Sequence, residues 1–75
     1  MMVNKRLLRS KMVEFGDNNV TLAGALDIAP QTLSNKMNET NGAEFNQGEM
    51  DVMRKRYNLT DSEFIAIFFA DIVSE

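Results

Sequence analysis

Four uncharged polar residues follow Pro30 at spacings that place them together on one side of a helix. Gln31, Asn35 and Asn38 stand at positions i, i+4 and i+7, and Ser34 lies beside them. Each amide side chain offers a donor and an acceptor together, and this pair matches the N6 and N7 edge of adenine in the major groove of DNA. The spacing therefore predicts that these four side chains form a face that contacts base edges.

The flanks of this face carry residues suited to the DNA backbone. Thr32 and Lys36 are placed for phosphates, together with Asn19 at the start of the preceding helix. A simpler interpretation stays open, because polar side chains opposite the apolar pair Leu33 and Met37 would also form an ordinary solvated helix surface.

Apolar periodicity divides the chain into five helices joined by short connections, so the expected fold class is all-α. The expected helices run from Asn4 to Phe15, from Val20 to Leu26, from Pro30 to about Met37, from near Asn46 to a stop at Asn58, and from Asp61 to Phe69. The polar segment from Glu39 to Gln47 is expected to be a loop with Phe45 as its apolar tether. We expect one compact domain over residues 1–75.

Residue types at the helix starts support these bounds. Asn46 with Glu49, and Thr60 with Glu63, have the spacing of capping boxes. Pro30 suits a first helical turn, because its missing N–H would have no partner there.

Three positions are expected to adopt a left-handed backbone. Gly16 and Asn58 would end the first and fourth helices. Asp27 occupies the turn between the second and third helices, where glycine is easiest and aspartate is tolerated. A steep crossing of these two helices needs a small residue where they touch, and Ala23 stands at that position. We therefore expect the two helices to cross steeply.

Composition limits the chemistry of the chain. Its 75 residues include no cysteine and no histidine, which excludes disulfides, zinc fingers, thiol nucleophiles and imidazole bases. The remaining carboxylates, lysines and hydroxyls show no catalytic pattern, so we expect no enzyme, metal site, cofactor or small-molecule ligand. The longest strongly apolar stretch, residues 64–70, is far shorter than the ~20 residues that cross a bilayer, and no targeting signal is visible. We therefore expect a cytoplasmic protein without membrane contact.

The net charge of −3 weighs against nucleic-acid binding, but the charges are unevenly distributed. Residues 1–13 carry four bases and no acid, whereas residues 57–75 carry four acids and no base. If the acidic end lies away from a ligand, the surface that faces phosphates can still be positive.

The last helix is apolar on almost every side, although so small a protein can bury only one of its faces. The remainder predicts that segment 64–75 contributes to a homodimer interface. The residues expected there are Phe64, Ile65, Phe68, Phe69 and Ile72. Alternatively, Phe69 to Ser74 leaves the helix and forms a short strand or arm across the partner.

The order of these features resembles the Cro and repressor family of phage helix-turn-helix proteins, which has the lambda-repressor-like fold. The residues that carry the resemblance are Leu8, Arg9 and Gly16, then Leu22, Ala23, Leu26 and Ile28, then Gln31 to Ser34, and finally Tyr57 to Thr60. It covers most of residues 4–69 and implies a five-helix bundle that binds operator DNA as a dimer, in a bacterial or phage-infected cell. The second and third helices would form the helix-turn-helix.

Several residues depart from that family pattern. Asp27 stands where glycine is usual, and Ala29-Pro30 replaces a serine cap and a polar residue that contacts bases. Lys36 stands where an apolar core residue is expected, and Met37 is the candidate to replace it in the core. Glu39 and Glu44 make the following loop acidic, which implies weaker phosphate contact on that side.

We therefore expect a Cro-like, sequence-specific transcription regulator that binds a pseudo-palindromic operator, with its third helix in the major groove. The acidic balance and the apolar carboxyl-terminal segment support one alternative, an antirepressor that keeps the fold but binds another protein. A protein that binds DNA without sequence preference is a third possibility, and the uncharged amide face argues against it.

Overall fold

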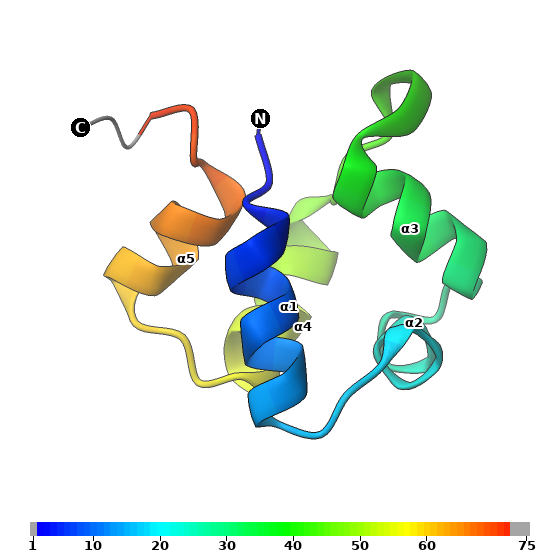
Figure 1. Cartoon of the computed structure of the whole chain (residues 1–75), viewed down its shortest axis with the longest axis horizontal. Helices are drawn as coiled ribbons and strands as arrows, with labels where there is room; N and C mark the ends of the chain where they lie inside the picture. The colour runs from blue at the N-terminus through cyan, green and yellow to red at the C-terminus, as the bar shows by residue number, and fades with distance from the viewer. Residues whose placement is uncertain (1, 73–75) are drawn as a thin grey trace.

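Five α-helices and one short 3-10 helix account for most of the chain (Figure 1). The structure is a computed structural model, and it describes residues 2–72. Its elements are α1 (Lys5–Glu14), α2 (Asn19–Leu26), α3 (Pro30–Asn38), η1 (Thr40–Gly42), α4 (Gln47–Arg56) and α5 (Asp61–Phe68). No strand occurs in residues 2–72, and the expected all-α class is confirmed. None of the helices in this range combines the length and apolarity needed to cross a membrane.

Side-chain caps begin the helices at the expected places. Asn46 and Thr60 each accept a hydrogen bond from the backbone of the third helical residue, whose own side chain bonds the cap in return. Asn18 begins α2 with the same reciprocal arrangement. Pro30 is the first residue of α3, where its ring fits without loss of a helical hydrogen bond. Both predicted capping boxes are therefore confirmed.

Left-handed residues end the first four α-helices. Asp27 has φ 59°, Asn58 has φ 50° and Gly16 has φ 74°, as expected from their types. Glu39 also adopts φ 54° at the end of α3, which the sequence did not indicate. The expected loop after α3 contains η1, and its tether Phe45 is buried as predicted. Helix α5 ends at Phe68, one residue earlier than expected.

One hydrophobic core joins all five α-helices, with α1 passing between α5 on one side and the α2–α3 pair on the other (Figure 1). The buried apolar residues are Val3, Leu8, Met12, Leu22, Ala23, Leu26, Leu33, Met37, Phe45, Met53, Tyr57, Leu59, Ile67 and Phe68. The radius of gyration is 11.4 Å. A compact domain of this length has a radius of gyration of about 11 Å, so the helices enclose the core without leaving the chain extended.

The segment before α1 ties the ends of α3 and α5 together. The Val3 amide donates to the Glu39 carboxylate at 3.0 Å. The Asn4 amide donates to the Ile67 carbonyl at 2.7 Å, and the Ala70 amide donates to the Met2 carbonyl at 3.0 Å. These bonds fix the carboxyl-terminal end of α3 relative to the rest of the bundle.

Candidate functional site

The turn between α2 and α3 has the compact geometry expected from its residues. Asp27 takes the left-handed conformation, and its amide donates to the Gly24 carbonyl at 3.2 Å. The Ile28 amide then reaches the Ala23 carbonyl at 3.0 Å. In Figure 1, α2 is seen nearly end-on while α3 runs across the view, so the two axes are steeply inclined. Ala23 is buried at this contact, which explains why a small residue is needed there.

Gln31 and Asn35 form a hydrogen-bonded pair on the outer face of α3. The Gln31 Nε2 group donates to Asn35 Oδ1 at 3.0 Å, and this bond fixes the two side chains relative to each other. Within the described residues, Gln31 Oε1 and Asn35 Nδ2 have no further partner. The pair therefore presents one acceptor and one donor, the chemical set that the N6 and N7 edge of adenine requires.

Ser34 and Asn38 also form hydrogen bonds within the protein. Ser34 Oγ accepts from Asn19 Nδ2 at 3.3 Å, which links α3 to α2. Asn38 donates to the Ser34 carbonyl at 3.0 Å and accepts from Lys5 Nζ at 2.7 Å. The structure thus brings all four predicted residues to one face, where Gln31 and Asn35 bond each other and Ser34 and Asn38 bond neighbouring groups of the protein.

Lys36 does not face a possible DNA backbone, and the expectation that it contacts phosphates needs correction. Its ammonium group donates to both carboxylate oxygens of Glu49 on α4, at 2.7 and 2.8 Å. The two side chains are only 17% and 8% exposed. Moving Lys36 toward a phosphate would leave the Glu49 charge buried without its partner, which is costly. Thr32 lies half-buried on the flank of α3, so its predicted role is left open.

Glu49 has two roles that the sequence indicated only in part. Its capping contact with the Asn46 amide, at 2.9 Å, was expected from the spacing. Its ion pair with Lys36 was not expected, although a lysine at an apolar helix position indicates that a buried partner is needed. Met37 occupies the core as expected, being 2% exposed.

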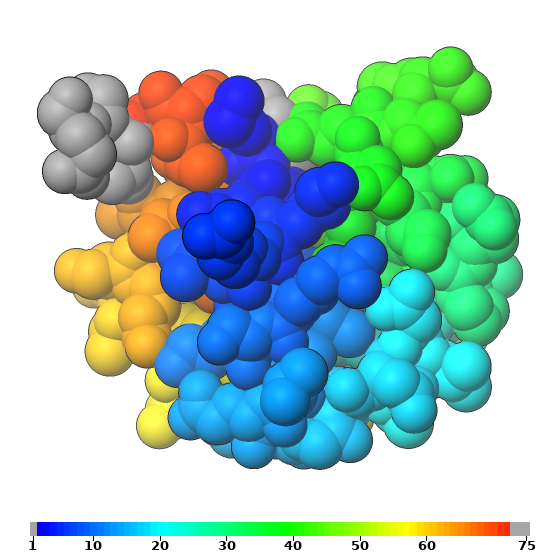
Figure 2. Space-filling view, in the orientation of Figure 1, coloured from blue at the N-terminus to red at the C-terminus, as the bar shows by residue number. Residues whose placement is uncertain are grey.

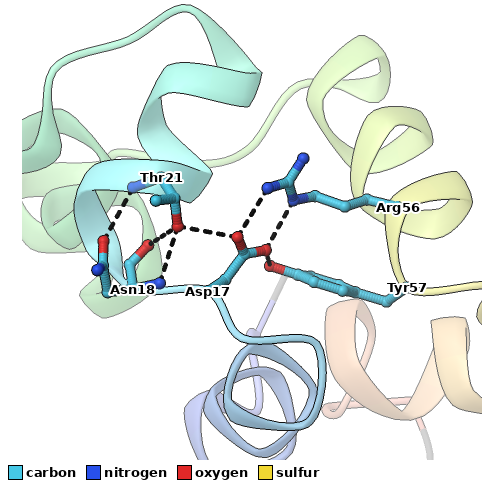
Figure 3. A network of polar contacts seen from close by, with 5 residues as sticks. All are labelled: Asp17, Asn18, Thr21, Arg56 and Tyr57. Carbon is cyan, nitrogen blue, oxygen red and sulfur yellow. Dashed lines mark hydrogen bonds and ion pairs between the residues drawn. The ribbon is translucent and has the colours of Figure 1, made fainter.

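A second polar network joins the α1–α2 connection to the end of α4 (Figure 3). The Asp17 carboxylate accepts from Arg56 Nε and Nη2, both at 2.7 Å, and from the Tyr57 hydroxyl at 2.6 Å. Thr21 Oγ1 adds a fourth donor at 2.8 Å. The Arg56 bonds above all hold the pKa of Asp17 well below its usual range, while burial and Asp17 raise the pKa of Tyr57. Sequence analysis missed this network, because Asp17 and Arg56 are far apart along the chain.

The predicted dimer residues divide into buried and exposed groups. Phe68 is fully buried in the core of its own chain, so its assignment to a dimer interface is wrong. Phe64 and Phe69 are half-buried against the core, and the Arg54 guanidinium covers the Phe64 ring at 5.1 Å. Ile65 and Ile72 remain exposed.

The arm predicted from Phe69 to Ser74 is only partly visible. Residues 69–72 form turns rather than a strand, and Val73 and Ser74 lie outside the described residues. Next to α5, a shallow groove runs along α1 and is lined mainly by apolar atoms. Its lining residues include Leu7, Ala66 and Ile67. Leu7 is itself partly exposed, so apolar surface continues from α5 onto α1.

Comparison with known proteins leaves the function to be inferred from the residues themselves. No family model, curated protein or solved structure matched this chain. The amide pair on α3 and the charges around it are therefore the basis for assigning a function.

Proposed function

We propose that this protein is a sequence-specific transcription regulator that binds duplex DNA with α3 in the major groove. The observation that carries the proposal is the Gln31 and Asn35 pair, whose outward atoms are one acceptor and one donor. Paired amide groups discriminate adenine from other bases without adding charge, so they favour sequence-specific binding over binding to any DNA.

The neighbourhood of the pair supports interpreting α2 and α3 as a helix-turn-helix of the lambda-repressor type. The left-handed residue Asp27 and the buried Ala23 allow the steep crossing that such a motif needs. The sequence resemblance to Cro and repressor proteins agrees with this interpretation. An α-helix fits the width of the major groove, and the exposed side of α3 carries no large apolar residue that would oppose its entry.

A homodimer would match this function, because a two-fold dimer places two recognition helices about 34 Å apart on successive turns of DNA. Ile65 and Ile72, at 41% and 69%, are the most exposed of the residues predicted for the contact. Binding of such a dimer across a promoter would exclude RNA polymerase, which is the mechanism of a Cro-like repressor.

Selection of bound duplexes from a random pool at moderate salt tests the proposal. We expect an inverted repeat, and we expect Gln31→Ala or Asn35→Ala to weaken selected binding by about 1–3 kcal/mol. Binding to random DNA should change much less. Gln47→Ala is the matched control, because it removes an exposed amide from α4. Equal losses on selected and random duplexes would contradict base recognition by α3.

An antirepressor that binds another protein is the second candidate, favoured by the exposed apolar residues Val13 and Val20 at 77% and 67%. The two functions differ in their response to salt. Contact with phosphates makes log affinity fall steeply with log salt. Absence of duplex binding even at low salt, together with a tight protein partner, would favour the antirepressor.

A further inference from the structure

Half of the basic side chains have their charge compensated by an acidic partner within the protein. The chain has eight lysines and arginines. Those in ion pairs are Lys11, Lys36, Arg54 and Arg56. In the described part of the chain, the bases without an acidic partner are Lys5, Arg6, Arg9 and Lys55. Three of these four belong to α1.

Two of the α1 bases lie beside the α3 face. Lys5 reaches across to Asn38 at 2.7 Å, and this bond leaves two of its three ammonium hydrogens available. Arg9, one turn further along α1, lines a groove together with Asn18 and Asn19 at the start of α2. Asn19 in turn donates to Ser34 of α3. Figure 2 shows the surface of α1 in blue passing directly into that of α2 in cyan and α3 in green.

Helical spacing explains why these two bases share a side of α1. Lys5 and Arg9 are four residues apart, so their side chains project in nearly the same direction. Leu8 and Met12 point into the core from the adjacent side. Arg6 lies next to the pair and is exposed.

We infer that Lys5 and Arg9, with Arg6 beside them, bind the phosphates of a DNA strand that passes along the α1 side of the α3 face. This inference rests on the proposed function. The bases on α1 take the role in phosphate contact that the sequence suggested for Lys36. Guanidinium and ammonium groups are the usual donors to phosphate oxygens, and such contacts set the register of a protein on the duplex.

Two acidic groups near these bases form hydrogen bonds within the protein. Asp17 lines the same groove as Arg9, but its side chain is 4% exposed and its charge is paired with Arg56. Glu39 lies at the same end of the bundle as Lys5, where its carboxylate accepts from the Val3 amide at 3.0 Å. A phosphate strand along α1 would therefore meet Lys5, Arg6 and Arg9, with Glu39 as an acidic neighbour at the end of α3.

The test measures how duplex affinity depends on salt, using the unaltered protein and the variants Lys5→Gln and Arg9→Gln. We expect each variant to bind selected and random duplexes more weakly by a similar factor. Each should reduce the slope of log affinity against log salt by about one, the value for one lost phosphate contact. The matched control is Lys55→Gln, which removes an unpaired base from α4 and should leave the slope unchanged.

Two failures can be distinguished. Duplex binding by the unaltered protein with the same slope in Lys5→Gln, Arg9→Gln and Lys55→Gln would overturn the inference and leave the proposed function standing. Absence of duplex binding by the unaltered protein at low salt would overturn both. Circular dichroism of each variant shows whether the helical fold is retained, and all three substituted side chains are exposed, so folding should be unaffected.

Discussion

Replacement of Asp17 by asparagine should remove a large part of the stability of the fold. The carboxylate accepts four hydrogen bonds, from Arg56 twice, Tyr57 and Thr21. A hydrogen bond to a charged group contributes about 1.5–3 kcal/mol. Asparagine retains some of these bonds, and the Arg56 side chain is 36% exposed, so water can replace part of what is lost.

We therefore expect the free energy of unfolding to fall by about 2–3 kcal/mol in Asp17→Asn. A chain of 75 residues has a total stability of roughly 4–11 kcal/mol, so the loss is a substantial fraction. Urea unfolding at pH 7, followed by circular dichroism, measures the change. Asp51→Asn is the control, because Asp51 is exposed on α4 and should matter by less than about 0.5 kcal/mol. An equal effect of the two substitutions would refute the role of the network.

The same substitution should change how stability depends on pH. The pKa of Asp17 is lower in the folded state than in the unfolded state, mainly because of the Arg56 bonds. Its stabilisation is therefore fully present well above the unfolded pKa of about 3.9 and is lost as pH falls toward the folded value. In Asp17→Asn, the free energy of unfolding should therefore fall less steeply as pH decreases below about 5. A residual decline is expected, because Lys11 also lowers the pKa of Glu63. An unchanged acid decline in Asp17→Asn would contradict this assignment.

Three further substitutions test other parts of the structure by urea unfolding. Lys36→Met should lower the free energy of unfolding by about 2–4 kcal/mol, because it leaves the Glu49 carboxylate buried alone. The double variant with Lys36→Met and Glu49→Gln should recover most of this loss, and failure to recover it would contradict the pairing. Asp27→Gly should stabilise by up to about 1 kcal/mol, because glycine adopts the left-handed conformation without strain, and a destabilised variant would be unexpected. Phe45→Ala should lower the free energy of unfolding by about 3–5 kcal/mol, because the ring packs against Phe68 in the core. A change below about 1 kcal/mol would show that the fold does not need this tether.

Helix ends were predictable from the sequence because their signals act over three or four residues. Thr60 caps α5 through the amide of Glu63, and both partners are visible in a short window of sequence. The left-handed turns at Asp27 and Asn58 follow in the same way from residue types that tolerate positive φ. These local signals were sufficient to give the number and order of the helices.

Pairings between distant side chains could not be predicted in this way. Arg56 is one of three consecutive bases on α4, and nothing local distinguishes it as the partner of Asp17. Lys36 shows the same limit, because its apolar setting could be recognised but the identity of its partner Glu49 could not. Both partners depend on how helices separated in sequence pack together.

The apolar residues of α5 illustrate a related limit. Periodicity cannot show which side faces the core when apolar residues occur on nearly every side. The fold decides the matter through contacts from elsewhere: the extended segment before α1 bonds Ile67 through the Asn4 amide, and Phe45 packs against Phe68. Phe68 is therefore internal, while Ile65 projects outward.

The charges of the candidate DNA surface follow from these long-range pairs. A net charge of −3 suggests weak binding to DNA, but net charge does not determine the electrostatic potential at one face of the protein. Arg56, Lys36 and Arg54 are paired with acids, so their charges are largely compensated within the protein. The unpaired bases on α1 lie next to an α3 face whose own polar side chains are uncharged. Such a surface would obtain only a few phosphate contacts from α1, so discrimination between sequences would depend on the geometry of the Gln31 and Asn35 pair.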